Sequence, residues 1–506
     1  MEQSSVFPSG NHKNVKKQNI QIQTYGQRLF RDQTFYEYLL EFLLVFISNK
    51  GAEGKTKEKD DGFSFPVHLK EDKLAYYPYP RMGLKRFVFL SRSEPDKRFD
   101  VDIDALDDHR DYLKNKITIS DTSLDKDFIL DILQDLLYGF NAIIGKRSWF
   151  AQSLLPVAPE LIFSEAIGSK KQRESLVYAN ELDEVDYDFE FNRRSFMARG
   201  GEVYYLHVLQ GLVENNELKE ELEKLLSELI KGIPQLSIIS NFLQGSWEDY
   251  HYPNNTEVSP PITKTMEWIP ANYKKRAVYT VKELKNLLNS LINPLEKIDL
   301  LGTLIIFQIM RMMCLQASEK LENEDNLEWV IDLTNNPNGQ IRKRATSSYL
   351  KIEENVFRAV HTADIATYIE NAKRKRAEPD IYEDASKDTN RLIRKLGKDI
   401  EFIVPPKGAN MRFSFNEDLI KLIVIVLIEP GERMLLNTFL EKCYVHFKII
   451  IGPKEAKIHW KEEPDIDFSP FDENLEKFQQ ALKDSGFLRD LSDATSIVEN
   501  PFKGWC

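Results

Sequence analysis

Apolar side chains recur at the spacing of an α-helix through most of this chain. Leucine and isoleucine fall on one helical face in residues 218–230 and again in residues 281–292. In the second run, Thr280 and Glu283 have the spacing of a capping box, which predicts a helix that begins near Thr280. The same period runs from Asp127 to Ala142. The pattern therefore predicts a mainly α-helical protein.

A minor β component is predicted near the N-terminus. Residues Phe63 to Arg92 are rich in aromatic and β-branched side chains and are interrupted by proline, which favours a small sheet or a few edge strands. The stretch before them, Ser48 to Gly62, carries charges and glycines and is typical of a loop.

Three apolar runs are each interrupted by a polar or charged residue: Leu39–Ile47, Leu300–Met310 and Leu419–Ile428. All are shorter than the roughly 18 residues that a membrane span needs. We interpret them as buried core helices. The first 24 residues are polar and contain no apolar segment of a secretory signal, so we expect a cytoplasmic protein.

Two breaks divide the chain. Asp249 to Thr265 is dominated by proline, asparagine and threonine, and Val404 to Gly408 contains a Pro-Pro pair. We predict an N-terminal mixed α/β domain at 1–250, a helical middle domain at 265–404 and a C-terminal domain at 410–506.

The C-terminal domain opens with an apolar helix. Asn416 is placed to cap a helix that continues through Leu427. The β-branched run Val424 to Val426 makes a buried strand the alternative. Pro430-Gly431 then predicts a turn.

The remaining elements of this domain follow in a definite order. An amphipathic helix extends from Asn437 or Thr438 to Phe447, and an acidic loop is predicted from Gly452 to Pro470. A third helix spans Leu475 to Leu482, with Gly486 as its left-handed cap, and a short hairpin follows. The order resembles a winged-helix module. The predicted fold is therefore mainly α with a minor β component, a multidomain helical protein with a winged-helix-like C-terminal module.

Charge favours a protein partner for this module over DNA. Met411 to Phe502 contains 11 Lys and Arg against 17 Asp and Glu, a net charge of -6. The third helix carries Asp472, Glu473, Glu476 and Asp484 against Lys477 and Lys483. A helix that reads a DNA groove has to neutralise phosphates, and the 19-residue predicted loop before it is too long for a tight helix-turn-helix. A plain helical domain with a terminal hairpin is the alternative.

The densest basic residues lie in the middle of the chain. Residues 340–398 contain 14 Lys and Arg against 9 Asp and Glu, a net charge of +5. The candidates for nucleic-acid binding are Arg342, Lys343, Arg344, Lys373, Arg374, Lys375, Arg376, Arg391, Arg394 and Lys395. The alternative is a set of solvated helix faces, because charge runs commonly keep helices soluble.

A second candidate is an anion site. Its residues are Arg193, Arg194, Arg199, Gly200 and Gly201, where the glycine pair permits close backbone approach to an anion. The acidic run Glu181 to Glu190 precedes it, so internal ion pairing is the simpler explanation.

Composition and motifs argue against several classes of functional site. The chain has 506 residues, a net charge of -12 and three cysteines that are far apart. The eight histidines form no HxxxH, HExxH or HxH pair, and Gly139 to Ser148 departs from the spacing of a phosphate-binding loop. We therefore predict no metal site, no cofactor and no catalytic residue.

Two segments carry a resemblance to a known class of proteins. They are Arg194 to Leu206 and Asp418 to Phe502. They resemble accessory proteins of bacterial antiphage defence systems, of the type of the G subunit of the DNA-phosphorothioation-dependent restriction complex. The resemblance implies a role in restricting foreign DNA within a multiprotein assembly, beside ATPase or helicase subunits.

The expected function is thus a non-enzymatic scaffold or adaptor of an antiviral restriction assembly, with a possible DNA contact. Two alternatives stay open. One is a nuclease or nucleotide-processing effector with a dispersed site around Arg193, Arg194, Arg199 and Glu202. The other is a DNA-binding regulator that uses the C-terminal module.

Overall fold

The structure is a computed structural model. It describes residues 20–26, 34–52, 62–66, 74–79, 81–98, 100–120, 124–142, 152–163, 178–179, 186–187, 200–213, 215–251, 264–265, 274–322, 327–334, 336–371, 376–461, 466–492 and 495–503. The chain forms two compact units. Unit 1 comprises Met1–Phe35, Val203–Leu225 and Glu267–Cys506, and unit 2 comprises Tyr36–Glu202 and Leu226–Met266. The division into three domains, 1–250, 265–404 and 410–506, stays a prediction.

Helices dominate and strands are short, so the mainly α class is confirmed. The helices of unit 1 are α1 (Ile20–Tyr25), most of α7 (Gly200–Leu212) and α8 (Asn216–Ile230), α10 (Lys274–Asn289), α11 (Pro294–Lys320), α12 (Gln340–Ala359), α13 (Ile365–Asn371), α14 (Glu378–Asp399), α15 (Glu417–Leu427), α16 (Leu436–Phe447), α17 (Pro453–His459) and α18 (Pro470–Asp484). Its strands are β6 (Trp329–Val330), β7 (Ile403–Val404), β8 (Arg412–Phe413), β9 (Arg433–Leu435), β10 (Ile449–Ile450), β11 (Leu488–Ser492) and β12 (Thr495–Glu499).

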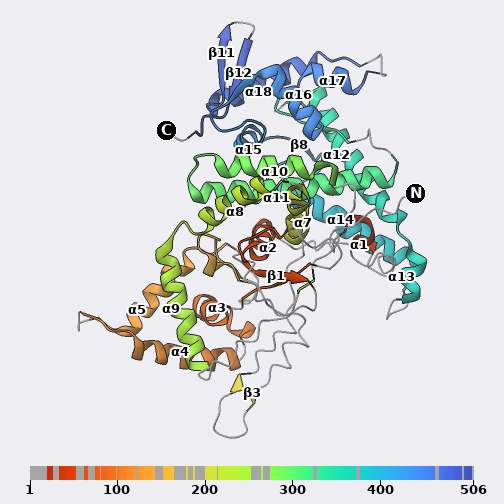
Figure 1. Ribbon diagram of the computed structural model, residues 1–506. Coiled ribbons are helices and arrows are strands. Elements are labelled where there is room, and N and C mark those ends of the chain that lie inside the picture. The colour runs from red at the N-terminus through yellow and green to blue at the C-terminus, as the bar shows by residue number, and fades with distance from the viewer. Residues whose placement is uncertain are drawn as a thin grey trace. The chain divides into compact units, whose positions relative to one another are not determined.

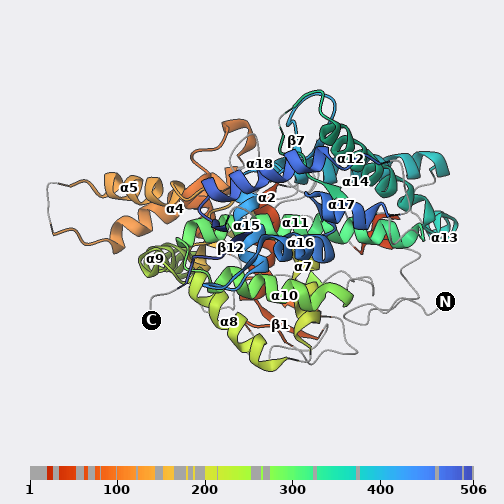
Figure 2. The ribbon, with the colours of Figure 1, turned by 90° about the horizontal axis from the view of Figure 1, so that it is seen from above.

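The long helix α11 is the central element of unit 1. Residues Leu300 to Cys314 are all buried. By length and composition α11 could cross a membrane, but 89% of its apolar window is buried, as in a core helix. Phe307 packs against Trp329 and Phe447, with ring centroids 5.0 and 5.3 Å apart. Helix α10 runs beside α11 in both views (Figures 1 and 2).

The C-terminal elements of unit 1 follow the predicted order. Asn416 caps α15 by accepting a hydrogen bond from Leu419 N at 2.9 Å, so the helix is confirmed and the alternative strand is wrong. Gly486 has a φ of +77° after α18, as a left-handed cap requires. Strands β11 and β12 form the predicted hairpin (Figure 1), and β12 pairs with β9 in a three-stranded antiparallel sheet.

Two local predictions in this unit are wrong. The acidic segment from Gly452 to Pro470 contains helix α17, which begins at Pro453 and buries Glu455 and Ala456. Helix α10 begins six residues before Thr280, so Thr280 is not a cap. Its hydroxyl lies 2.9 Å from His207 Nε2 in the core, where tertiary contacts outweigh the local capping signal.

The C-terminal elements share a core with the middle of the chain. Strand β10 pairs in parallel with β6. One buried cluster contains residues from both parts: Val330, Ile341, Ala345, Ile450, Ala456 and Phe471. Asn474 of α18 is fully buried, and its amide donates to Ile331 O and Ile451 O, both at 2.9 Å. The inner face of α18 is therefore committed to packing within unit 1.

Unit 2 combines helices with a small sheet. Its helices are α2 (Phe35–Ile47), α3 (Met82–Phe89), α4 (Asp100–Lys116), α5 (Lys126–Tyr138) and α9 (Pro234–His251), and its strands are β1 (Asn49–Ala52), β2 (Leu74–Tyr77), β3 (Tyr178–Ala179), β4 (Asp186–Tyr187) and β5 (Lys264–Thr265). Strands β1, β2 and β5 form one antiparallel sheet. Of the three, β2 lies in the segment that was predicted to be extended. Strand β1 lies in the stretch from Ser48 to Gly62, so the predicted loop is wrong at residues 49–52. The expectation that the segment through Arg92 is extended is wrong from Met82 onward, because α3 is a helix that is buried along its whole length.

The core of unit 2 is built around Trp247 of α9. A Cβ on Gly83 would lie 2.3 Å from Trp247 Cβ, so glycine lets α3 and α9 approach closely. Arg86 and Asp102 form a buried ion pair at 2.8 Å beside the indole. The rings of His109 and His251 lie 5.3 and 4.0 Å from Trp247.

Burial keeps these two histidines neutral. Desolvation lowers the pKa of His109 to about 4, with a hydrogen bond to Leu243 O opposing the shift. Desolvation likewise lowers the pKa of His251 to about 3. In the unfolded chain both rings bind protons below about pH 6.5. The unfolded state therefore binds more protons than the folded state as the pH falls below that value, and acidification destabilises the fold.

The fully buried His109 gives a test. Between about pH 6.5 and 5 its neutrality costs about 1.4 kcal/mol of unfolding free energy per pH unit. We expect His109→Gln to reduce the pH dependence of the unfolding free energy by about that slope, measured by urea unfolding. The exposed His361→Gln is the matched control and should leave the slope unchanged. Equal slopes in His109→Gln and the parent protein would contradict the assignment.

Candidate functional site

Unit 1 carries a groove with a volume of about 1370 Å³. Its walls come from α8, α10, the end of α15, β9 and α16. The charged residues that line it are Glu217, Glu221, Arg276, Lys282, Glu283, Lys285, Glu429, Glu432, Arg433, Glu441, Lys442 and His446. Both signs of charge are present along the groove, so it has no uniform electrostatic preference for an anion or a cation.

A buried polar network forms the floor of this groove. Glu283 of α10 is almost fully buried. One of its carboxylate oxygens contacts His446 Nε2, and the other accepts a hydrogen bond from the Gln308 amide. Arg311 Nη1 lies 3.5 Å from the carboxylate. The network therefore joins α10, α11 and α16.

Arg311 brings a positive charge into the core. Its side chain is 2% exposed, and burial lowers the pKa of the guanidinium to about 10, against the opposing influence of Glu283. The group stays charged at neutral pH. Its Nη2 donates to the backbone oxygen of His446 at 2.8 Å, and the guanidinium lies over the Phe447 ring at 4.9 Å. Glu283 supplies the compensating charge that a buried guanidinium requires.

His446 stands where the floor meets the groove. Burial lowers the pKa of its imidazole, and the hydrogen bond to Glu283 opposes that shift. Tyr279 packs edge-on against the ring, with centroids 4.8 Å apart. Arg276 Nη1 donates to His446 O at 2.7 Å. The imidazole is thus held in one position by contacts on several sides.

The hydroxyl groups among the lining residues of the groove are those of Tyr279 and Thr438, and the Tyr279 ring contacts His446. Cys443 is buried, and burial raises the pKa of its thiol well above the usual value. In the described part of the chain no three His, Cys, Asp or Glu residues gather as a metal would require.

The predicted basic residues do not line the groove. They lie on α12, on α14 and in the segment before α14, and Lys373, Arg374 and Lys375 fall outside the described residues. Several are engaged internally: Arg376 pairs with Asp384 at 2.5 Å, Arg394 pairs with Glu353, Lys395 pairs with Asp399 at 2.9 Å, and Arg344 lies over the Trp460 ring. Lys343 and Arg391 are exposed, Arg342 is half-buried, and none of the three makes an ion pair with a described residue.

The predicted anion site falls partly outside the described residues, which exclude Arg193, Arg194 and Arg199. Its glycines open α7. A Cβ on Gly200 would lie 1.8 Å from the Tyr38 ring, so the pair permits close packing. Gly201 N donates to Glu41 Oε2 at 2.7 Å, and Tyr76 Oη donates to Glu202 Oε1 at 2.6 Å. The Gly201 amide already serves an internal carboxylate, and the anion site stays a prediction.

Helix α18 presents its predicted charges to solvent. Asp472, Glu473, Glu476 and Asp484 are exposed, as are Lys477 and Lys483. Lys483 pairs with Asp490 at 2.6 Å. The outer face is therefore acidic, while the inner face holds Phe471, Asn474, Phe478 and Leu482 in the core.

No protein-family model, curated protein or solved structure matches this chain. The groove was missed at the sequence level, although one signal was present: Gln308 and Arg311 interrupt an otherwise apolar helix, and buried polar residues of this kind need partners. The positions of those partners, Glu283 and His446, are not readable from local pattern.

The floor of the groove gives a stability test. Glu283→Ala removes the charge that compensates buried Arg311, and we expect the unfolding free energy to fall by about 3–5 kcal/mol. The measurement is urea unfolding at neutral pH. Glu217→Ala, at the exposed rim of the same groove, should change it by less than about 0.5 kcal/mol. A loss no larger in Glu283→Ala than in Glu217→Ala would show that Arg311 does not depend on this carboxylate.

Proposed function

We propose that this protein is a non-enzymatic adaptor of a multiprotein assembly, and that residues 410–506 form a winged-helix-like module that docks on a protein partner. The observation that carries the proposal is the outer face of α18, with four exposed carboxylates against two lysines. A helix at this place in a DNA-reading winged helix meets phosphates. An acidic face repels phosphates and suits a basic protein surface.

The way α18 is held supports the same proposal. Its inner face is anchored by Asn474, which bonds Ile331 O and Ile451 O. A helix fixed in this way offers a rigid outer face, and rigid surfaces lose little freedom on binding. The groove, with cations and carboxylates side by side, also fits a protein segment better than a polyanion.

The assembly that we propose is a cytoplasmic antiviral restriction system, in which the partners are subunits of the ATPase or helicase type. The resemblance of two segments to accessory proteins of such systems motivates this part. One alternative is a nuclease or nucleotide-processing effector with a dispersed site around Arg193, Arg194, Arg199 and Glu202. The other is a DNA-binding regulator that uses the C-terminal module.

Co-purification with the proteins encoded beside its gene tests the adaptor. We expect a complex that co-elutes in size-exclusion chromatography. The double variant Glu473→Lys, Glu476→Lys should weaken it about ten-fold or more, because it turns the outer face of α18 basic.

The control reverses two exposed carboxylates elsewhere in unit 1, Glu354→Lys and Glu370→Lys. It applies the same change in net charge and should leave the complex intact. Absence of any complex would refute the adaptor. A complex that forms equally well with the α18 variant would show that the docking face lies elsewhere on the protein.

We propose as a second element a DNA contact through the basic middle of unit 1. Lys343 and Arg391 favour it, because both are exposed and neither is paired with a described residue. Cations that already pair with carboxylates, such as Lys395 with Asp399, have less to gain from a phosphate.

If the basic middle of unit 1 contacts DNA, its basic residues should differ in how much they contribute to the salt dependence of binding. For a duplex of about 30 base pairs, Lys343→Ala with Arg391→Ala should reduce the dependence of log K on log salt by about two, near one for each lost phosphate contact. Lys395→Ala should change the slope much less. Fluorescence anisotropy over a salt series measures it. A protein that does not bind the duplex, or a slope equally affected by all three residues, would argue against this contact.

A further inference from the structure

Helix α5 of unit 2 leaves an apolar face uncovered. Phe128, Ile132 and Leu136 are 55, 48 and 45% exposed, and Leu124 just before the helix is 44% exposed. Phe128, Ile132 and Leu136 recur every fourth position, so they form one ridge along the helix. From Phe128 to Leu136 the ridge is about 12 Å long at the rise of an α-helix. A continuous exposed ridge differs from isolated surface hydrophobics, which need no explanation.

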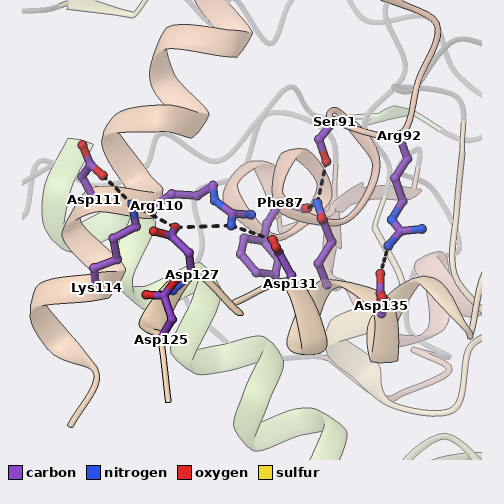
Figure 3. Close-up of polar contacts among 11 residues, drawn as sticks. Phe87, Ser91, Arg92, Arg110, Asp111, Lys114, Asp125, Asp127, Asp131 and Asp135 are labelled. Atoms are coloured by element: carbon purple, nitrogen blue, oxygen red, sulfur yellow. Dashed lines mark hydrogen bonds and ion pairs between the residues drawn. The ribbon is translucent and has the colours of Figure 1, made fainter. Parts of the chain in front are cut away.

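The opposite side of α5 accounts for its stability within unit 2. Leu130, Gln134 and Leu137 are buried. The Gln134 amide donates to Ser91 Oγ at 2.7 Å and also contacts Phe87 O (Figure 3). Helix α4 lies beside α5 (Figure 2). The apolar ridge is thus not needed to hold α5 in place.

A row of aspartates borders the ridge. Asp127 pairs with Lys114 at 2.9 Å, Asp131 pairs with Arg110 at 2.7 Å and Asp135 pairs with Arg92 (Figure 3). These exposed pairs hold their cations against α4 and α5, each pair contributing little energy. Nearby Asp104 and Asp107 of α4 are exposed and make no ion pair with a described residue.

The net charge of the helices around the ridge indicates what kind of partner covers it. Residues 100–138, which contain α4 and α5, have 11 Asp and no Glu against 4 Lys and Arg, a net charge of -7. A second copy of the chain would bring the same acidic surface and a further net charge of -12. A helix with an apolar stripe and a basic border complements both features at once.

We propose that the α5 ridge is a second docking surface, and that its occupant is a basic amphipathic helix of a partner protein. The apolar stripe of that helix covers Phe128, Ile132 and Leu136, and its lysines or arginines face the net negative charge of α4 and α5. Unit 2 would thereby hold one partner independently of the α18 face. The proposal does not rest on the winged-helix-like module, because every residue that carries it lies outside 410–506.

The test uses the full chain and a labelled probe peptide of about 18 residues, with leucines on one helical face and lysines on the other. We expect binding that weakens with salt, and an increase in Kd of about ten-fold or more in Ile132→Asp and in Phe128→Asp. A twin peptide with glutamates in place of lysines should bind at least about ten-fold more weakly. Fluorescence anisotropy measures each Kd.

The matched control is Ile238→Asp in α9, which changes another exposed isoleucine of unit 2 and should bind the lysine peptide as the parent does. Equal binding by the parent and Ile132→Asp would overturn the proposal, as would a preference for the glutamate peptide. A dimer that Ile132→Asp converts to a monomer would assign the ridge to a second copy and overturn it also.

Discussion

The organisation of unit 1 depends on one buried charge. Helix α11 passes through the core, and its apolar residues leave no solvent beside Arg311. A guanidinium in such a place is tolerated only with a compensating charge and with acceptors for its donors. Glu283 of α10 supplies the charge, and the backbone oxygen of His446 in α16 accepts from both Arg311 and Arg276. The consecutive helices α10 and α11 are therefore held to the distant α16 by a polar contact, while the aromatic packing of Phe307 supplies the apolar contribution around it.

This constraint limits which surfaces of unit 1 can serve a partner. Helix α16 is tied to α10 and α11, and α18 is tied to β6 and β10 through Asn474. The inner faces of these helices are committed to the core, so function has to lie on their outer faces and along the groove. On α18 the outer face is acidic. The groove has both signs of charge, and its imidazole is held by Glu283 and Tyr279.

What could be predicted from the sequence is what short-range physics decides. The cap at Asn416, the left-handed Gly486 and the amphipathic period of α5 each depend on residues within one or two turns, and all three are confirmed. The helix α3 was missed because its aromatic and β-branched residues favour strands locally, and packing against α9 overrides that preference. Thr280 has the spacing of a helix cap. Its actual contact is with His207, 73 positions away, which a local pattern cannot show. The groove could not be foreseen for the same reason, since Glu283 and His446 are separated by 163 positions. The order of the C-terminal elements was readable, and the attachment of that segment to the middle of the chain was not.

An acidic surface is a feature that the two units share. The α18 face in unit 1 and the hairpin of α4 and α5 in unit 2 are both acidic, and the whole chain carries a net charge of -12. Two such surfaces repel polyanions and favour basic proteins, so a nucleic acid could approach only where carboxylates are locally outnumbered. That condition holds in residues 340–398, and within them chiefly at cations that have no carboxylate partner in the described structure. In the function that we propose, the sign of charge separates protein contacts from a nucleic-acid contact, because a surface that attracts one class of partner repels the other.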